Sequence, residues 1–140
     1  MKRNLVFLSL VAILTVAVSL AYAGTAKTMN VNVPFEFYVQ DQLLPAGEYK
    51  FEMSGAPLAA ASVVTVRTLN GTGIRFLLTR SEINTGLPQS HLRFNQYDEK
   101  CFLSSVSIGD YKANVTMFSL EKELRIGNTN SRTITLVAQK

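Results

Sequence analysis

The stretch that decides the fold is VNVPFEFYV, residues 31–39, in which every second residue is apolar. Successive side chains on a strand point to opposite faces, so this pattern predicts a β-strand with one buried face. Pro34 has no amide hydrogen to give to a neighbouring strand. We therefore expect this strand to lie at a sheet edge, or to turn the position of Pro34 away from its neighbour.

A second strand follows in the stretch LPAGEYKFEM, residues 44–53. Its first four residues, Leu44–Gly47, predict a turn, because proline fixes a negative φ and glycine is free to take a positive one. Tyr49, Phe51 and Met53 then alternate with charged residues. This alternation predicts a second strand with one buried and one solvated face.

Further strands are predicted along the rest of the chain by alternation and by β-branched residues. They span residues 62–69, 74–79, 91–97, 101–108, 111–117 and 133–138. Residues 80–90 contain turn formers throughout and predict a long exposed loop. In residues 101–108 apolar side chains occur in both alternate sets. Both faces of that strand are therefore expected to be covered.

Residues 118–126 fit two structures. As a strand, their apolar residues share one face, with Lys122 as the one misfit. As a helix, they follow a cap at Ser119 and end at Gly127, and their Glu, Lys and Leu content favours this reading. The whole pattern predicts an all-β fold: a single-domain antiparallel sandwich or small barrel of about seven to eight strands with one short C-terminal helix.

The register of the hairpin between residues 62–69 and 74–79 depends on whether its loop is odd or even. An even loop would place Arg67 among apolar residues. We prefer an odd loop with a glycine bulge, which leaves Arg67 and Arg75 on one face, opposite each other or nearly so. Such a pairing is unfavourable unless an anion or carboxylate lies between the two charges. Arg67 and Arg75 are therefore binding candidates; the alternative is a solvated face neutralised by nearby Glu residues.

Residues 1–23 have the three parts of a signal peptide. A short basic start precedes an apolar run over residues 5–20, and residues 21–23, Ala-Tyr-Ala, supply the small side chains of a cleavage site. The alternative is an uncleaved membrane anchor, since the apolar run approaches the roughly 20 residues that span a bilayer. We expect cleavage, which leaves residues 24–140 as one exported domain, periplasmic or extracellular, without a stable membrane anchor.

Composition narrows the class of protein further. Removing 23 residues from 140 leaves 117, which suits one domain with one core. The chain has 14 basic and 10 acidic residues, so loss of the two basic residues of the signal gives 12 minus 10, a charge of +2. So mild a charge indicates no nucleic-acid partner. Cys101 is the only cysteine; we expect a buried thiol, the alternatives being an intermolecular disulfide or a reactive thiol.

The sequence contains no recognisable catalytic set. His91 and Cys101 fall on neighbouring strands but about six residues apart along them, roughly 20 Å, which is too far for a nucleophile pair. One His and one Cys cannot supply a usual zinc set. Glu48 and Glu52 share a strand face at roughly 13 Å from each other, beyond the spacing of paired catalytic carboxylates. We therefore expect no enzyme, no metal and no cofactor.

Two motifs resemble a known group of proteins. VPFEFYV at residues 33–39, followed by LPAGEY at residues 44–49, resembles the opening of small uncharacterised secreted bacterial proteins that read V-P-F-x-F-x-V and then L-P-A-G-x-Y. The hairpin from Arg93 to Leu103 and the segment Ser119–Leu124 are similar to that group's middle and tail. The resemblance implies export and a β-rich domain, and it carries no activity that could be transferred to this chain.

Three functions remain open from the sequence. The first is a non-enzymatic exported β domain with a binding or cell-envelope structural role, whose partner would be an envelope component. The second is a lipocalin-like carrier that encloses a small apolar ligand in a cavity lined by Phe35, Phe37, Phe76 and Phe94. The third is an enzyme whose site is assembled from loops near residues 80–91.

Overall fold

The computed structural model describes residues 26–54, 62–71, 74–83, 86, 89–127 and 130–138, with the side chains of residues 74–78 left out of the description. The predicted signal peptide, residues 1–23, lies outside the described residues.

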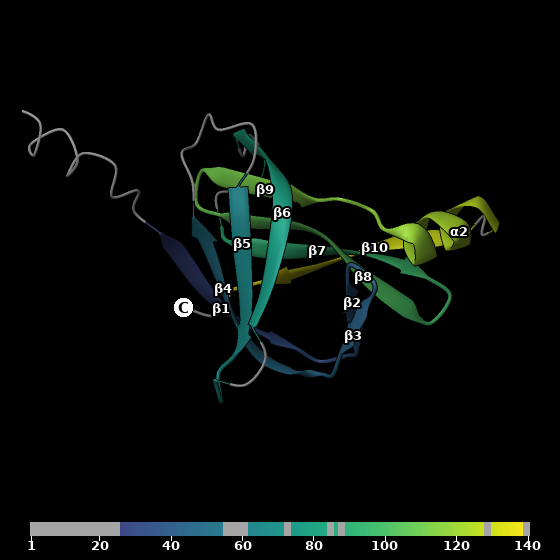
Figure 1. Ribbon diagram of the computed structural model, residues 1–140, viewed down its shortest axis with the longest axis horizontal. Helices are drawn as coiled ribbons and strands as arrows, with labels where there is room; N and C mark the ends of the chain where they lie inside the picture. Colours follow the sequence, from purple (N-terminus) through teal and green to yellow (C-terminus); the bar gives the residue numbers. More distant parts are fainter. Residues whose placement is uncertain are drawn as a thin grey trace, which may run out of the picture.

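The described part of the chain forms ten strands and one helix (Figure 1). They are β1 (Lys27–Val33), β2 (Phe37–Val39), β3 (Gln42–Leu44), β4 (Gly47–Ser54), β5 (Ser62–Thr68), β6 (Ile74–Ile83), β7 (His91–Tyr97), β8 (Lys100–Ile108), β9 (Tyr111–Val115), α2 (Ser119–Gly127) and β10 (Ser131–Val137). The predicted all-β fold with one short C-terminal helix is confirmed.

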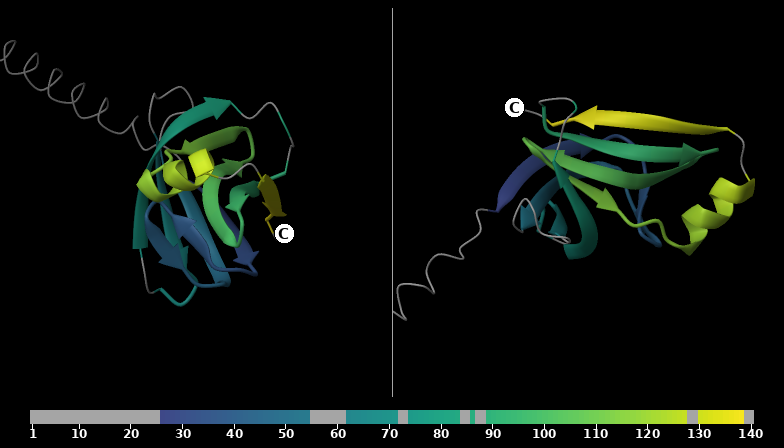
Figure 2. Two further views of the ribbon diagram at one scale, coloured as in Figure 1. Left: turned by 90° about the vertical axis from the view of Figure 1, so that its right-hand side faces the viewer. Right: turned by 90° about the horizontal axis from the view of Figure 1, so that it is seen from above.

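All ten strands belong to one open, mixed sheet. The sheet runs in the order β1-β4-β5-β6-β9-β8, and β8 pairs in addition with β7 and with β2. Beyond these, β10 pairs with β7 and β3 pairs with β2. The β2–β8 pair is parallel, whereas the other pairs of the sheet are antiparallel. The sheet curls, so that β1 and β10 lie close to each other (Figure 2).

The strand predicted over residues 31–39 is divided in the structure. β1 ends at Val33, and β2 begins at Phe37. The chain between them, which starts at Pro34, takes the polypeptide from its pairing with β4 to its pairing with β8. β1 pairs with β4 alone, so the expected edge position holds for residues 31–33. It is wrong for residues 37–39, because β2 lies between β8 and β3. The inward residues stay buried on both sides of the break, because the period of two resumes in β2.

Two other predicted segments differ in their bounds. Residues 80–83 belong to β6 rather than to a loop, because residues 79–83 pair with β9. The polar residues of this segment fit a strand that has one solvated face. Helix α2 ends at Gly127 as expected. At its start the Lys122 amide donates to the Phe118 carbonyl at 3.0 Å, so Phe118 rather than Ser119 occupies the N-cap position.

A β-bulge changes the alternation of β8. Arg93 is opposite Ser105 but the next residue of β7 is opposite Leu103, so Ser104 is an extra residue in β8. The bulge brings Leu103 and Val106 to the same, inner face, although they are three residues apart. The outer residues of β8 are also buried. Covering of both faces is thus confirmed, whereas a simple alternation through the strand is wrong.

The inner faces of the strands share one hydrophobic core. Its buried members come from β1, β2, β4, β5, β7, β8 and β9. The turn before β4 is tied to this core, because the Tyr49 hydroxyl donates to the Pro45 carbonyl at 2.6 Å. The Tyr49 ring itself is buried. The core therefore lies within the curl of the sheet, and the opposite face of the strands is the outer face.

Candidate functional site

His91 and Cys101 lie far apart along the β7–β8 hairpin. His91 is opposite Ser107, and Cys101 is opposite Gln96. Along the strands, His91 and Cys101 are therefore separated by about five residues of β7, roughly 17 Å. The His91 Nδ1 atom lies 2.8 Å from the Gln89 carbonyl oxygen. Cys101 is buried, as expected, and burial raises the pKa of its thiol. Such a thiol is a poor nucleophile, because the thiolate is the reactive form.

The predicted register of the β5–β6 hairpin is wrong. Arg67 is opposite Ile74, and Val66 is opposite Arg75. Adjacent cross-strand pairs alternate between the two faces of a sheet, so the two arginine positions belong to opposite faces. The like-charge pairing that made Arg67 and Arg75 binding candidates does not form in this register.

The loop of this hairpin explains the register. Residues 68–73 separate the paired Arg67 and Ile74, and this number of residues is even. The loop begins with a turn in which the Gly71 amide donates to the Thr68 carbonyl at 3.0 Å. Gly71 has a positive φ of 77°, which glycine adopts without a steric cost. The odd loop with a glycine bulge that the sequence analysis preferred is therefore wrong.

Three of the four phenylalanines predicted to line a ligand cavity pack together. The Phe35 and Phe94 rings meet edge to face at 5.3 Å, and the Phe37 and Phe94 rings do so at 5.4 Å. Tyr49 makes a further edge contact with Phe37 at 5.2 Å. The side chain of Phe76 lies outside the described residues. Ring contacts of this geometry are typical of a packed core.

Helix α2 packs on the outer face at one end of the β7–β8 hairpin (Figure 2). The residues that meet there form the helix-covered cluster: Tyr38, Asn95, Tyr97, Phe102 and Glu121. The Tyr38 and Phe102 rings are stacked at 4.9 Å, and Tyr97 meets Phe102 edge on at 5.9 Å. The cluster therefore forms a small aromatic core outside the main one.

Glu121 connects α2 to this aromatic core. Its carboxyl oxygen Oε1 accepts a hydrogen bond from Asn95 Nδ2 at 3.0 Å, and the Tyr97 hydroxyl also donates to the carboxyl group. Glu121 is only 5% exposed, and burial raises its pKa above the ordinary value, although both donors and Arg125 act in the opposite direction. Burial likewise raises the pKa of Tyr97. The hydrogen bonds from Asn95 and Tyr97 thus hold the Glu121 carboxyl, and with it α2, against the β7–β8 hairpin.

A row of polar residues crosses the outer face next to the helix-covered cluster. Arg93 of β7 is opposite Ser105 of β8, Ser105 is opposite Asn114 of β9, and Asn114 is opposite Arg80 of β6. We call these four residues the polar row. Asn95 of the helix-covered cluster is two residues from Arg93 on β7, so the two regions adjoin on the same face.

A second row lies two residues further along the strands. It consists of His91, Ser107, Lys112 and Glu82. The Lys112 ammonium lies 3.5 Å from the Glu82 carboxylate. Hydrogen bonding from Asn114 and the charge of Lys112 hold the pKa of the Glu82 carboxyl below its ordinary value. Glu82 therefore stays ionised and neutralises Lys112 at the rim of the face.

Three polar atoms of these rows are buried without a hydrogen-bond partner. They are Arg93 Nε, Ser105 Oγ and Ser107 Oγ. The serines are 2% and 0% exposed, respectively, and each stands between longer cross-strand neighbours. A buried hydroxyl without a partner loses its hydration and gains nothing in return, at a cost of about 1–3 kcal/mol. Such groups are rare in folded proteins and call for an explanation.

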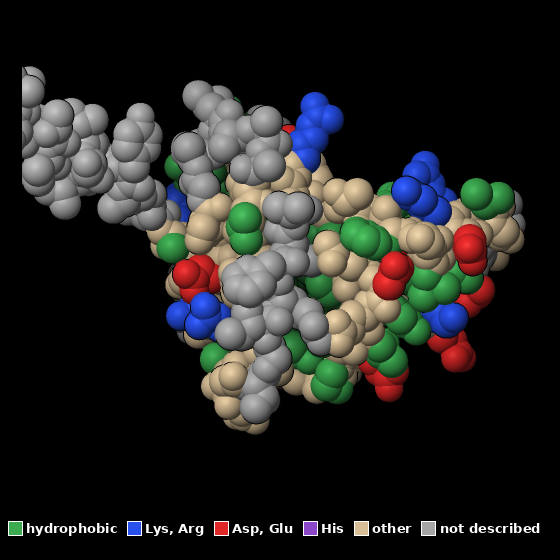
Figure 3. Space-filling view, in the orientation of Figure 1, with side chains coloured by type: hydrophobic (Ala, Val, Ile, Leu, Met, Phe, Trp, Pro, Cys, Tyr) green, Lys and Arg blue, Asp and Glu red, His purple; other side chains and the backbone are tan. Residues whose placement is uncertain are grey.

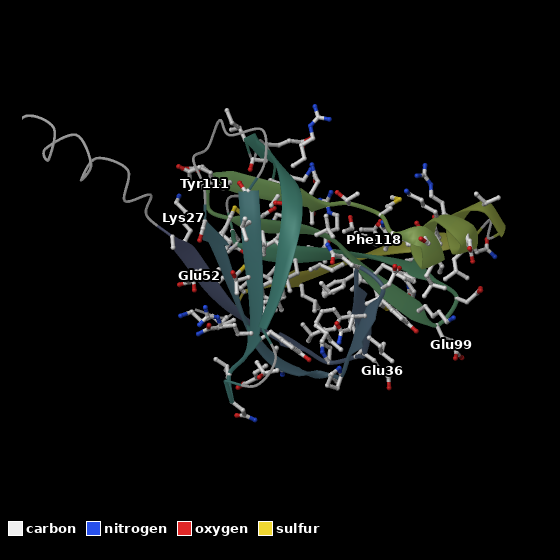
Figure 4. All side chains as sticks on the ribbon, in the orientation of Figure 1. Lys27, Glu36, Glu52, Glu99, Tyr111 and Phe118 are labelled. Atoms are coloured by element: carbon white, nitrogen blue, oxygen red, sulfur yellow. The ribbon has the colours of Figure 1, made fainter. Side chains whose placement is uncertain are left out.

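Other charged residues of the described chain have different surroundings. Lys27 Nζ lies 3.9 Å from the Tyr111 ring centre, near the start of β1 (Figure 4). Glu48 is exposed and Glu52 half-buried on β4. Charged side chains of both signs are scattered over the face shown in Figure 3, and hydrophobic ones gather between α2 and the β2–β3 hairpin. Within the described ranges, no group of three or more His, Cys, Asp or Glu side chains could hold a metal ion.

The sequence did not identify the polar row. Its four residues come from β6, β7, β8 and β9, and the order of these strands in the sheet does not follow their order in the chain. One signal was present, since three serines, Ser104, Ser105 and Ser107, stand among the apolar residues of 101–108. A polar residue at a buried strand position requires a partner, and the pairing of β8 with β9 is needed to show where that partner would lie.

Among the residues that the structure describes, no helix has the length and apolar character needed to cross a membrane. Comparison with family models, with curated proteins and with solved structures found no match to this chain. The resemblance to small secreted bacterial proteins therefore stays a prediction from the two motifs. What the chain does has to be inferred from its own surface and core.

Proposed function

We propose that this protein is a non-enzymatic exported β domain that acts by binding, and that it binds on the outer face of β6, β9, β8 and β7. The observation that carries this proposal is the placement of its unpartnered polar atoms. Arg93 Nε, Ser105 Oγ and Ser107 Oγ all belong to that face. Buried polar groups without a protein partner call for an explanation such as a bound ion or water, and proteins depart from full hydrogen bonding mainly at functional or strained sites.

The packing of the interior supports surface binding over the lipocalin-like carrier. A carrier holds its ligand in a cavity within the barrel. Here the Phe35, Phe37 and Phe94 rings contact each other at the place where that cavity was predicted. The core residues around them form one continuous cluster.

The positions of the reactive side chains support a binding role over catalysis. A general acid or nucleophile acts together with partners within hydrogen-bond reach. Glu121 contacts Asn95 and Tyr97 beneath α2. His91 and Cys101 pair at other positions along the β7–β8 hairpin, with Ser107 and Gln96 respectively. Residues 80–83, part of the segment proposed for a loop-built enzyme site, are paired within β6.

Native mass spectrometry of the exported protein tests this proposal. The full chain is expressed with residues 1–23 intact and is recovered from the periplasm or medium. We expect the mass of residues 24–140, without a bound apolar molecule. An apolar ligand at one copy per chain, lost in Phe37→Ala, would favour the carrier. Retention of residues 1–23 would contradict export as a released domain, and a turnover abolished by Glu121→Gln would contradict the non-enzymatic role.

A further inference from the structure

The polar row has the width of a small-ligand site. Neighbouring strands of a sheet lie about 4.8 Å apart, so the three steps from Arg80 to Arg93 span roughly 14 Å. The short residues Ser105 and Asn114 occupy the middle of the row, and the long arginines stand at its ends. Two arginine side chains in this arrangement can converge on one group bound above the serine and the asparagine.

The electrostatics of the row favour an anion. Three cations, Arg80, Arg93 and Lys112, share the two rows with one carboxylate, Glu82, which leaves two positive charges. The carboxylate of Glu82 lies beside Lys112. The charge of Arg80 also acts on Glu82, but within the described ranges no ion pair joins Arg80 or Arg93 to an acidic side chain.

The hydrogen-bonding groups of the row can all act as donors. Arginine has only donors, and serine and asparagine each have at least one. Asn114 uses one of its amide hydrogens on Glu82, which leaves the second. Ser105 Oγ and Arg93 Nε are buried and unpartnered. A group rich in acceptor oxygens would satisfy all of them together.

We propose that the polar row binds a small solute that carries a phosphate-type oxyanion. This inference rests on the proposed function and names the ligand class of the same face. Arginine pairs with phosphate through two parallel charge-assisted hydrogen bonds. Phosphate also has further oxygens for the Ser105 hydroxyl and the Asn114 amide, whereas a carboxylate has two oxygens in all.

The number of cations favours a solute over a membrane surface. Segments that recognise anionic lipids gather about four to eight Lys and Arg residues. The outer face of β6, β9, β8 and β7 has three cations, Arg80, Arg93 and Lys112, and Lys112 lies beside the carboxylate of Glu82 at the rim. A lipid bilayer would bring many phosphates against that carboxylate, whereas a single solute phosphate needs only the polar row.

Titration of the exported protein with inorganic phosphate, followed by NMR chemical shifts of backbone amides, tests the inference. We expect saturable shifts at the polar row, with weaker binding of acetate. Arg93→Gln and Arg80→Gln should each reduce phosphate affinity about tenfold, the effect of losing a hydrogen bond to a charged group. Ser105→Ala should reduce it several-fold. Arg67→Gln is the matched control, since Arg67 is an exposed arginine on β5 outside the row.

Failure of the phosphate site and failure of the proposed binding function give different results. Shifts that do not saturate, equal losses in Arg67→Gln and Arg93→Gln, equal binding of acetate, or binding only to phosphatidylglycerol vesicles would overturn the phosphate site. Each of these results leaves the native mass spectrum unchanged, so a binding domain with another ligand would remain supported. A co-purified apolar ligand or a measured turnover would instead overturn the proposed function.

Discussion

Asn95 and Arg93 lie two residues apart on β7 and on the same face, but the fold surrounds them differently. Asn95 donates to the buried carboxyl of Glu121 beneath α2. Arg93 has a buried Nε without a partner, beside the equally unpartnered hydroxyl of Ser105. The helix-covered cluster thus completes its hydrogen bonds within the chain, and the adjoining polar row does not.

This difference separates a region that contributes to stability from the region that we propose for binding. The helix-covered cluster brings three aromatic rings together, and a short helix is held to it through Glu121, which accepts hydrogen bonds from Asn95 and Tyr97. A helix of this length is marginal on its own, so it needs tertiary contacts of this kind. The polar row gains no such packing and leaves donors unused. Substitutions in the two regions should therefore change stability in opposite directions.

The largest effect is expected at Phe102. This ring is 2% exposed and contacts both Tyr38 and Tyr97, so Phe102→Ala should lower the free energy of unfolding by about 4 kcal/mol through lost burial and an unfilled cavity. Urea denaturation of the native chain and the variant measures the change. Leu43→Ala is the control, because Leu43 is 47% exposed on β3, and it should cost less than about 0.5 kcal/mol. Similar losses in the two variants would show that the cluster adds no special stability.

A smaller effect is expected at Glu121. Glu121→Ala removes the acceptor of Asn95 and Tyr97, and it should lower the free energy of unfolding by about 2 kcal/mol at acidic pH. Urea titrations at pH 4 measure this loss. Glu121→Gln keeps an acceptor oxygen and should stay within about 1 kcal/mol of the native chain at that pH. If Glu121→Ala unfolds with the same free energy as the native chain, the hydrogen bonds to Glu121 do not stabilise the fold.

A comparison of the native chain with Glu121→Gln also tests the raised pKa of the Glu121 carboxyl. Burial raises the pKa of Glu121 above 4.5, so its contribution to stability is complete below that pH and is lost as the pH rises through the raised pKa. Compared with Glu121→Gln, the native chain should become less stable as the pH rises from about 4.5 through that raised pKa. A constant difference between the two unfolding curves across this range would show that the carboxyl does not titrate in a buried environment.

The sequence predicted most of the strands, since their periodicity depends on local residues. Residues 48–53 show this most clearly, because their alternation matches the burial pattern of β4. Two features required knowledge of the tertiary pairing. The bulge at Ser104 is not marked by a glycine, and the parallel β2–β8 contact joins segments more than 60 residues apart. Neither leaves a local pattern.

The candidate site was harder to predict than the fold. The pairing of Arg67 with Arg75 depends on the loop of a single hairpin, and the preferred odd loop is wrong, because an even number of residues separates Arg67 from Ile74. The polar row instead combines Arg80, Ser105 and Asn114 from strands that become neighbours only when β9 inserts between β6 and β8. Chemistry assembled across a sheet depends on strand order, and strand order is set by long-range contacts.

The smallest expected effect lies in the polar row and has the opposite sign. Ser105→Ala removes a buried hydroxyl that has no partner, so it should raise the free energy of unfolding by up to about 1 kcal/mol. Ser62→Ala is the matched control. Ser62 is also a buried serine, but its hydroxyl contacts that of Ser81, and its removal should lower the free energy by about 1 kcal/mol. Urea denaturation of both variants measures the difference.

If Ser105→Ala is as destabilising as Ser62→Ala, the Ser105 hydroxyl is satisfied within the fold, and the contrast between the polar row and the helix-covered cluster does not hold. A gain in stability together with weaker phosphate binding would mean that the chain gives up stability at this position in order to bind.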